Sequence, residues 1–66
     1  MNTTSYIVIV RDSTTGKALH RSEESSPRVI LSRVQYFLSR LGRDTRIERR
    51  TITEYGFTAH SFTLYL

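Results

Sequence analysis

The spacing of hydrophobic residues changes along the chain and predicts several elements in succession. Residues 5–12, SYIVIVRD, are dense in β-branched and aromatic side chains, as expected of a strand. The polar stretch at 12–16, DSTTG, predicts a turn, after which residues 17–22, KALHRS, return as a second strand. The first part of the chain is therefore expected to form a β-hairpin.

A helix follows, and it has the clearest pattern in the chain. Ser26 and Pro27 combine a favourable N-cap with the residue preferred at the first helical position, and Gly42 stands where a left-handed C-cap is expected. Apolar residues at helical spacing form one continuous stripe that is expected to face the core: Ile30, Leu31, Val34, Phe37, Leu38 and Leu41.

The last third of the chain predicts a second hairpin, with strands at 45–54 and 57–66 joined at Tyr55-Gly56. The order ββαββ predicts one α+β domain over residues 1–66, with residues 1–4 as a flexible tail. We expect a two-layer sandwich, in which a four-stranded, largely antiparallel sheet has one helix on one face. A right-handed crossover places the first strand inside the sheet, and the polar third strand is a candidate edge. Whether the third or the fourth strand lies beside the first stays open.

The third strand contains a mismatch in its hydrophobic pattern. Ile47 and Ile52 are five residues apart, so a regular strand would point them to opposite faces of the sheet. Either a bulge near Arg49 and Arg50 brings both isoleucines to the core, or one isoleucine faces outward and the two arginines are divided between the faces.

A single helix leaves one face of the sheet uncovered, and apolar side chains occupy both sides of the first strand. Ile7 and Ile9 share one side, whereas Val8 and Val10 share the other. An uncovered apolar patch on a small protein usually marks an interface, so this face could serve a homodimer or another partner. The alternative is that arginine and threonine stems shield it.

Charge is unevenly distributed along the sequence. The net charge is +4, and residues 28–50 carry seven arginines against Asp44 and Glu48, whereas residues 1–27 are balanced. Nine of the ten basic residues are arginine, which suits bidentate contacts with carboxylates or phosphates and stacking on rings, although codon usage would produce the same bias. The basic charge therefore belongs to the middle of the chain.

No motif in the sequence supports catalysis. Gly16-Lys17 resembles the end of a phosphate-binding loop, but Arg11 occupies the required glycine position and alanine follows the lysine. His20 and His60 lie outside any spaced ligand motif, and no nucleophile elbow is present. We expect a non-enzymatic protein with no cofactor and no metal site.

Cysteine usage and the N-terminal sequence bear on the compartment. The chain has no cysteine, so disulfides and thiolate metal sites are excluded. The N-terminal apolar run is too short for a signal peptide or a membrane span and has no basic segment before it. We expect a soluble cytoplasmic protein that does not act at a membrane.

The outer face of the helix is the strongest candidate for a binding surface. At 100° per residue, Arg33, Tyr36 and Arg40 fall together with Val29, away from the buried stripe. Exposed tyrosine and arginine are typical of protein interfaces and also of surfaces that stack bases and neutralise phosphates. The predicted partner-binding residues comprise these three and the arginines that continue the basic charge into the third strand: Arg33, Tyr36, Arg40, Arg43, Arg46, Arg49 and Arg50.

Two functions are compatible with these features. The first is a protein-binding module that recognises an acidic or nucleic-acid-handling protein. In size and layout the chain resembles the small inhibitors that bacteriophages use against host machinery, including anti-CRISPR and anti-transcription factors, and this resemblance implies an inhibitor that occupies a site or blocks a conformational change. The alternative is direct DNA or RNA binding through the basic helix and third strand.

Overall fold

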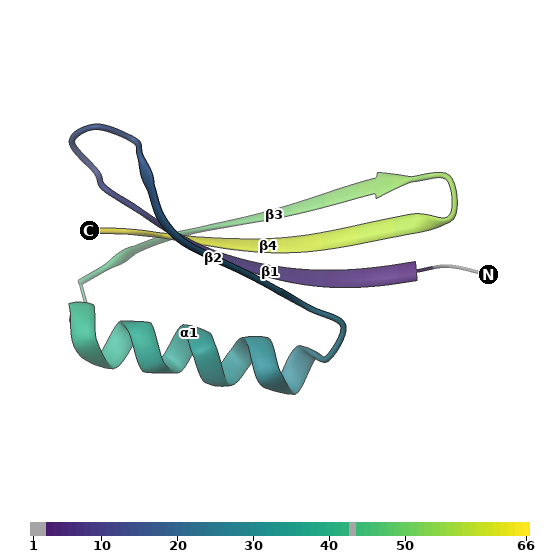
Figure 1. Cartoon of the computed structure of the whole chain (residues 1–66), viewed down its shortest axis with the longest axis horizontal. Coiled ribbons are helices and arrows are strands. Elements are labelled where there is room, and N and C mark those ends of the chain that lie inside the picture. The colour runs from purple at the N-terminus through teal and green to yellow at the C-terminus, as the bar shows by residue number, and fades with distance from the viewer. Residues whose placement is uncertain (1–2, 43) are drawn as a thin grey trace.

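The computed structural model describes residues 3–42 and 44–66 and contains four strands and one helix (Figure 1). The predicted order ββαββ and the α+β class are confirmed. The elements are β1 (Thr3–Arg11), β2 (Ala18–Glu24), α1 (Pro27–Leu41), β3 (Arg46–Glu54) and β4 (Phe57–Tyr65).

The four strands form one sheet in the order β2-β1-β4-β3. The outer pairs, β1 with β2 and β3 with β4, are antiparallel, whereas the central pair of β1 and β4 is parallel. The predicted internal position of β1 and edge position of β3 are therefore confirmed. The neighbour of β1 is β4, so these two strands are the central ones. Both carry apolar residues on both sides, and a central strand buries more of its surface than an edge strand does.

The expected tail over residues 1–4 does not include Thr3 and Thr4. Both belong to β1, where they lie opposite Phe57 and Thr58 of β4. The first two residues of that range lie outside the described residues.

The core lies between α1 and the central strands. Val8, Ile30, Val34 and Leu64 form its buried cluster, and Val8, Ile30 and Leu64 are fully buried. Partly buried apolar side chains from β1, β4 and the helix complete the packing: Tyr6, Phe37, Leu38, Leu41 and Phe62. The helix packs on β1 and β2, so it covers one side of the sheet and one part of that side (Figure 1).

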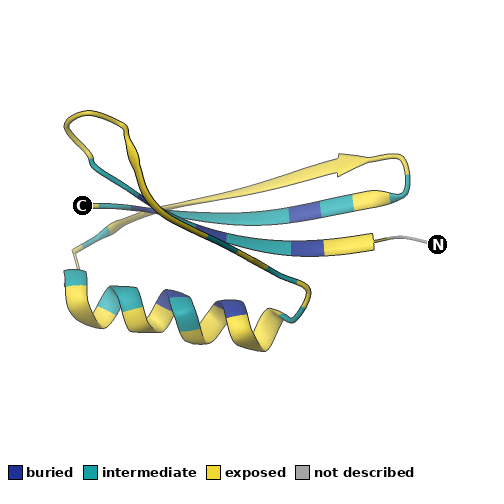
Figure 2. Cartoon of the chain, viewed as in Figure 1, coloured by how far each residue is buried: buried dark blue, intermediate teal, exposed yellow. Residues whose placement is uncertain are grey.

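The prediction that Leu31 faces the core is wrong, because 54% of this residue is exposed. Since α1 packs mainly on β1 and β2, it buries a narrow stripe centred on Ile30 and Val34 (Figure 2). Leu31 lies about 100° around the helix from Ile30 and falls outside that stripe.

The ends of α1 lie at the predicted residues but differ in detail. Ser26 is extended, with φ −97° and ψ 122°, and makes no side-chain capping bond. Gly42 has φ 105° and ψ 163°, which is outside the left-handed helical region expected for it. The backbone conformation that Gly42 does adopt, with positive φ and extended ψ, is also nearly restricted to glycine. Glycine is therefore required at this position, although for a different conformation than the one predicted. The Gly42 N–H donates to the Leu38 carbonyl at 2.9 Å.

The pairing of β3 resolves the isoleucine mismatch in favour of a regular strand. The β3–β4 register is continuous, with Ile47 opposite Leu64 and Ile52 opposite Ala59. Because Leu64 belongs to the core, Ile47 lies on the helix side of the sheet, and Ile52 lies on the other side, which we call the helix-free face. No bulge brings the two isoleucines together.

Candidate functional site

The outer surface of α1 brings together three of the predicted partner-binding residues, Arg33, Tyr36 and Arg40. Tyr36 is 52% exposed, and the Arg40 guanidinium lies over its ring with Cζ 4.6 Å from the ring centroid. Phe37 contacts Tyr36 edge to face, with centroids 5.5 Å apart. The tyrosine is thus held between a cation and a second ring, and one part of it stays open to solvent.

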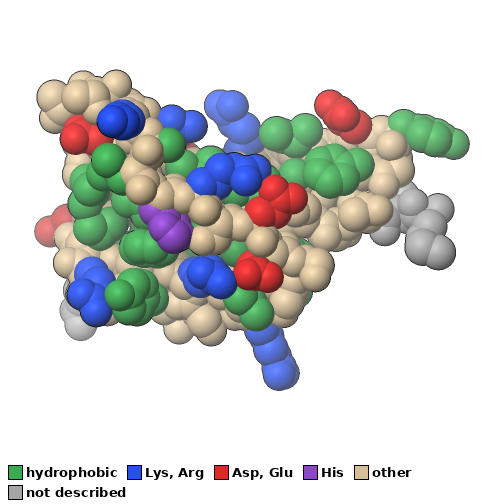
Figure 3. Space-filling model, in the orientation of Figure 1, with side chains coloured by type: hydrophobic (Ala, Val, Ile, Leu, Met, Phe, Trp, Pro, Cys, Tyr) green, Lys and Arg blue, Asp and Glu red, His purple; other side chains and the backbone are tan. Residues whose placement is uncertain are grey.

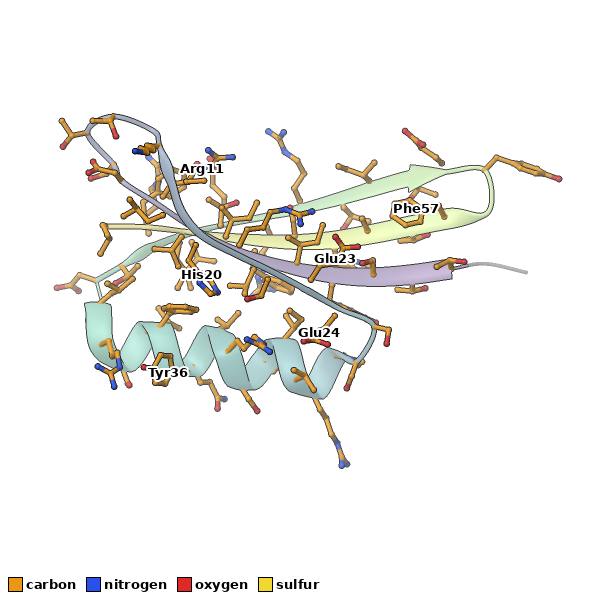
Figure 4. All side chains as sticks on the ribbon, viewed as in Figure 1. Arg11, His20, Glu23, Glu24, Tyr36 and Phe57 are labelled. Atoms are coloured by element: carbon orange, nitrogen blue, oxygen red, sulfur yellow. The ribbon has the colours of Figure 1, made fainter. Side chains whose placement is uncertain are left out.

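A shallow open cavity of about 490 Å³ lies beside Tyr36, between α1 and β2. Side chains from both elements line it: His20, Val29, Ser32, Arg33, Tyr36 and Phe37. Figure 3 shows a histidine side chain (purple) on this face of the molecule, with hydrophobic and basic side chains near it. Figure 4 shows His20 on the strand and Tyr36 on the helix below it. We call this surface the α1/β2 site.

Arg33 is fixed in place at the α1/β2 site. One of its terminal nitrogens lies 3.1 Å from Glu24 Oε1, and the other donates to Ser22 Oγ at 3.5 Å. Its Nε is buried and has no hydrogen-bond partner among the described residues. The charge of Arg33 is therefore paired within the chain, which makes this residue an ordered wall of the site.

His20 is a member of the site that sequence reasoning did not assign. Its Nε2 lies 2.6 Å from Ser22 Oγ, and its ring tilts against Phe37 with centroids 4.9 Å apart. Strand alternation carries the missed signal, because His20, Ser22 and Glu24 share one side of β2, and α1 packs against that side.

The remaining predicted arginines do not extend the α1/β2 site into one basic surface. Arg49 lies opposite Phe62, on the helix side of the sheet, whereas Arg50 lies opposite Ser61, on the helix-free face. Arg46 also lies on the helix-free face, where its guanidinium stacks over the Tyr65 ring at 4.1 Å. Arg43 lies outside the described residues. Regular alternation in β3 thus divides these arginines between two faces.

The helix-free face is hollowed into a shallow depression of about 290 Å³. Ile7, Ile9 and Ile52 form its apolar part, and Arg11, Arg21, Glu48, Arg50, Ser61, Thr63 and Tyr65 surround them. Ile7 and Ile9 are only partly exposed although no helix covers them. This arrangement favours shielding by long polar side chains, while a partner on this face stays a prediction.

One carboxyl group on the helix-free face has a shifted acidity. The Ser5 hydroxyl donates to Glu23 Oε1 at 2.9 Å, and Arg21 lies 3.0 Å from Oε2. The Ser5 hydrogen bond, followed by the hydrogen bond and charge of Arg21, lowers the pKa of Glu23 below its ordinary value. This network links β1 to β2.

Residues 3–42 and 44–66 show neither a cluster of metal ligands nor a membrane-spanning helix. No group of three or more His, Asp or Glu side chains in that part of the chain could hold a metal ion. No helix there combines the length and the apolar character needed to cross a membrane.

Comparison with known proteins gives no assignment. No protein-family model matches the chain, and neither the curated proteins nor the solved structures provide a match.

Proposed function

We propose that this chain is a non-enzymatic protein-binding module that docks a partner protein on the α1/β2 site. The observation that carries this proposal is the exposed Tyr36, stacked under Arg40 at the rim of an open cavity of mixed polar and apolar lining. Tyrosine and arginine are, together with tryptophan, the residues most enriched at the energetic centres of protein interfaces. A cavity next to them provides a place for an apolar or aromatic side chain of the partner.

The charge arrangement favours a protein over a nucleic acid as the partner. Direct nucleic-acid binding gains affinity from many unpaired cations along one surface. Here Arg33 is paired with Glu24, Arg46 approaches Glu48 at 4.0 Å, and the arginines of β3 are divided between two faces. Arg40 stacks on Tyr36 and has no ion pair with a described carboxylate, so its charge can attract an acidic group of the partner at the rim of the site.

We further propose that the partner is a nucleic-acid-handling or defence complex in the cytoplasm of a host cell, and that docking inhibits it. The small size of the domain and the absence of any catalytic motif support this proposal, as does the resemblance in layout to bacteriophage inhibitors. An inhibitor of this kind needs only one rigid binding surface, and α1 packed on β1 and β2 provides one.

Affinity capture from host lysate tests the proposal when it is done with matched variants. The bait proteins are the wild type, Tyr36→Ala, Arg40→Ala and the control Gln35→Ala, which changes an exposed residue of the same helix away from the site. We expect a protein that the wild type and the control retain and that Tyr36→Ala and Arg40→Ala lose, with melting temperatures within a few degrees of one another. Adding the wild type should then reduce the activity of the captured complex.

Two results would contradict the proposal. Equal capture by all four proteins would remove the α1/β2 site from the interface. Binding to random duplex or single-stranded DNA, with affinity falling steeply as salt is raised, would instead support direct nucleic-acid binding.

A further inference from the structure

The free edge of β3 is the longest unpartnered backbone edge in the described part of the chain. All nine residues of β3, Arg46–Glu54, are exposed, and Figure 2 shows the visible part of the strand in the colour of exposed residues. It contains no proline and pairs with β4 without a bulge. Its outer side therefore presents a straight row of N–H and C=O groups.

The other edge of the sheet is less suitable for pairing with another strand. β2 has seven residues, and its register with β1 shifts between Val10 and Arg11. The helix also packs against it. The β2 edge is therefore shorter than the β3 edge, irregular in register and close to the helix, whereas β3 has only its charged side chains to discourage pairing.

Those charges exclude most symmetric pairings of β3 with a second copy of itself. Antiparallel pairing about a two-fold axis sets residues at equal distances from the axis opposite one another on the same face. An axis at Glu48, Arg49 or Arg50 sets a charged residue opposite its own copy. An axis at Thr51 sets Glu48 opposite the partner's Glu54. Each of these arrangements brings like charges together, which destabilises a sheet.

An axis at Ile52 gives a complementary arrangement instead. Arg50 then lies opposite the partner's Glu54, and by symmetry this ion pair occurs twice. Thr51 lies opposite the partner's Thr53, a favourable cross-strand pair. Ile52, which is 47% exposed, lies against its own copy and is covered. Among axes from Glu48 to Ile52, which pair five or more residues of each β3, this is the one without a like-charge pair.

We propose that the chain forms a homodimer by antiparallel pairing of β3 with β3, centred on Ile52, so that two four-stranded sheets become one continuous sheet. We assign the edge to a second copy of the chain because, in this register, Arg50 and Glu54 of β3 lie opposite residues of the opposite charge in the other copy. The helix-free faces of both copies lie on the same side, so the covered Ile52 pair extends the apolar group of Ile7, Ile9 and Ile52. This inference does not depend on the proposed function of the α1/β2 site.

Charge exchange at the β3 edge tests the ion pairs. We expect sedimentation or light scattering to give a dimer mass for the wild type, and Arg50→Glu or Glu54→Arg alone to weaken the dimer about tenfold or more, since each variant sets like charges together twice. The double variant Arg50→Glu/Glu54→Arg restores opposite charges and should restore the dimer. Arg28→Glu makes the same change of net charge on an exposed helical residue and should leave the mass unchanged.

Cysteine cross-linking reads the register directly, because the chain has no cysteine of its own. Four single variants, Arg49→Cys, Arg50→Cys, Thr51→Cys and Ile52→Cys, place one thiol at successive axis positions. Only the residue on the axis lies opposite its copy, with Cβ atoms about 5 Å apart and within reach of a disulfide. We expect Ile52→Cys to form covalent dimers fastest under mild oxidation.

Several outcomes would overturn the inference. A wild type that stays monomeric up to millimolar concentration would exclude the dimer. A dimer that neither charge variant weakens, or that the double variant does not restore, would place the interface elsewhere. Fastest cross-linking at Arg49→Cys, Arg50→Cys or Thr51→Cys would refute the axis at Ile52.

Discussion

Replacing Ile30 and Leu31, two adjacent residues of similar size, tests how α1 is oriented on the sheet. Ile30 is 0% exposed and contributes to the buried cluster, whereas Leu31 is 54% exposed. A sequence pattern assigns both to the core. The structure assigns only Ile30, so the two alanine variants should differ strongly in the free energy of unfolding.

The expected magnitudes follow from burial. Ile30→Ala removes a fully buried side chain next to Val8 and Leu64 and should cost about 2–5 kcal/mol. Full burial of a leucine side chain contributes about 1.5–3 kcal/mol to stability. Because Leu31 is half exposed, Leu31→Ala should lower the free energy of unfolding by about 1 kcal/mol or less. Alanine is also the better helix former, which reduces that loss further.

Urea unfolding followed by circular dichroism measures the free energy of unfolding of each variant that still folds in water. A domain of this size has only about 3–5 kcal/mol of stability from one core, so Ile30→Ala is expected to be largely unfolded in water. Ile30→Val keeps the measurement within range, because its expected cost is about 0.5–1.5 kcal/mol with an unchanged slope against urea. If Leu31→Ala proved as destabilising as Ile30→Ala, the orientation of α1 described above would be refuted.

Two further changes test local features. Ser5→Ala removes the hydrogen bond that lowers the pKa of Glu23. It should therefore remove a contribution to stability that is fully present above the ordinary pKa of a glutamate and is lost as pH falls through the lower pKa of Glu23 in the folded protein. The difference in melting temperature between wild type and Ser5→Ala should therefore shrink on acidification; a difference that grows below pH 4 would contradict the assignment. Gly42→Ala forces alanine into a backbone region with φ 105° and should cost about 1–3 kcal/mol, measured by urea unfolding. Gln35→Ala, at an exposed interior position of α1, is the control and should be nearly neutral.

The positions of the elements could be predicted from sequence because each has a local signal. Pro27 and Gly42 mark the ends of α1, and a dense run of β-branched and aromatic residues marks β1. The exposure of Leu31 could not be predicted in the same way. An apolar stripe states which residues can be buried, but how wide a stripe is covered depends on how many strands the helix contacts, and that is a tertiary property.

The composition of the candidate site shows a similar division. Arg33, Tyr36 and Arg40 were predictable because helical periodicity places them on one face. His20 comes from β2, and its place beside Phe37 depends on the packing of the strand against the helix. Which face of the sheet each arginine of β3 occupies depended on whether the strand contains a bulge. The register is continuous, so strict alternation places Arg49 and Arg50 on opposite faces.

The strand order determines whether the two proposed interactions compete. The α1/β2 site lies at one edge of the sheet and the free edge of β3 at the other, with β1 and β4 between them. Pairing of β3 with its copy therefore leaves both α1/β2 sites open, and the dimer carries two of them. A partner with two docking sites would contact both α1/β2 sites of the dimer at once. The dimer would then bind this partner more tightly than the monomer does, provided that the spacing of the two docking sites matches that of the two α1/β2 sites. Under this arrangement Tyr36→Ala removes partner binding and leaves the dimer intact, whereas Arg50→Glu leaves each α1/β2 site intact and removes only the gain from bivalency.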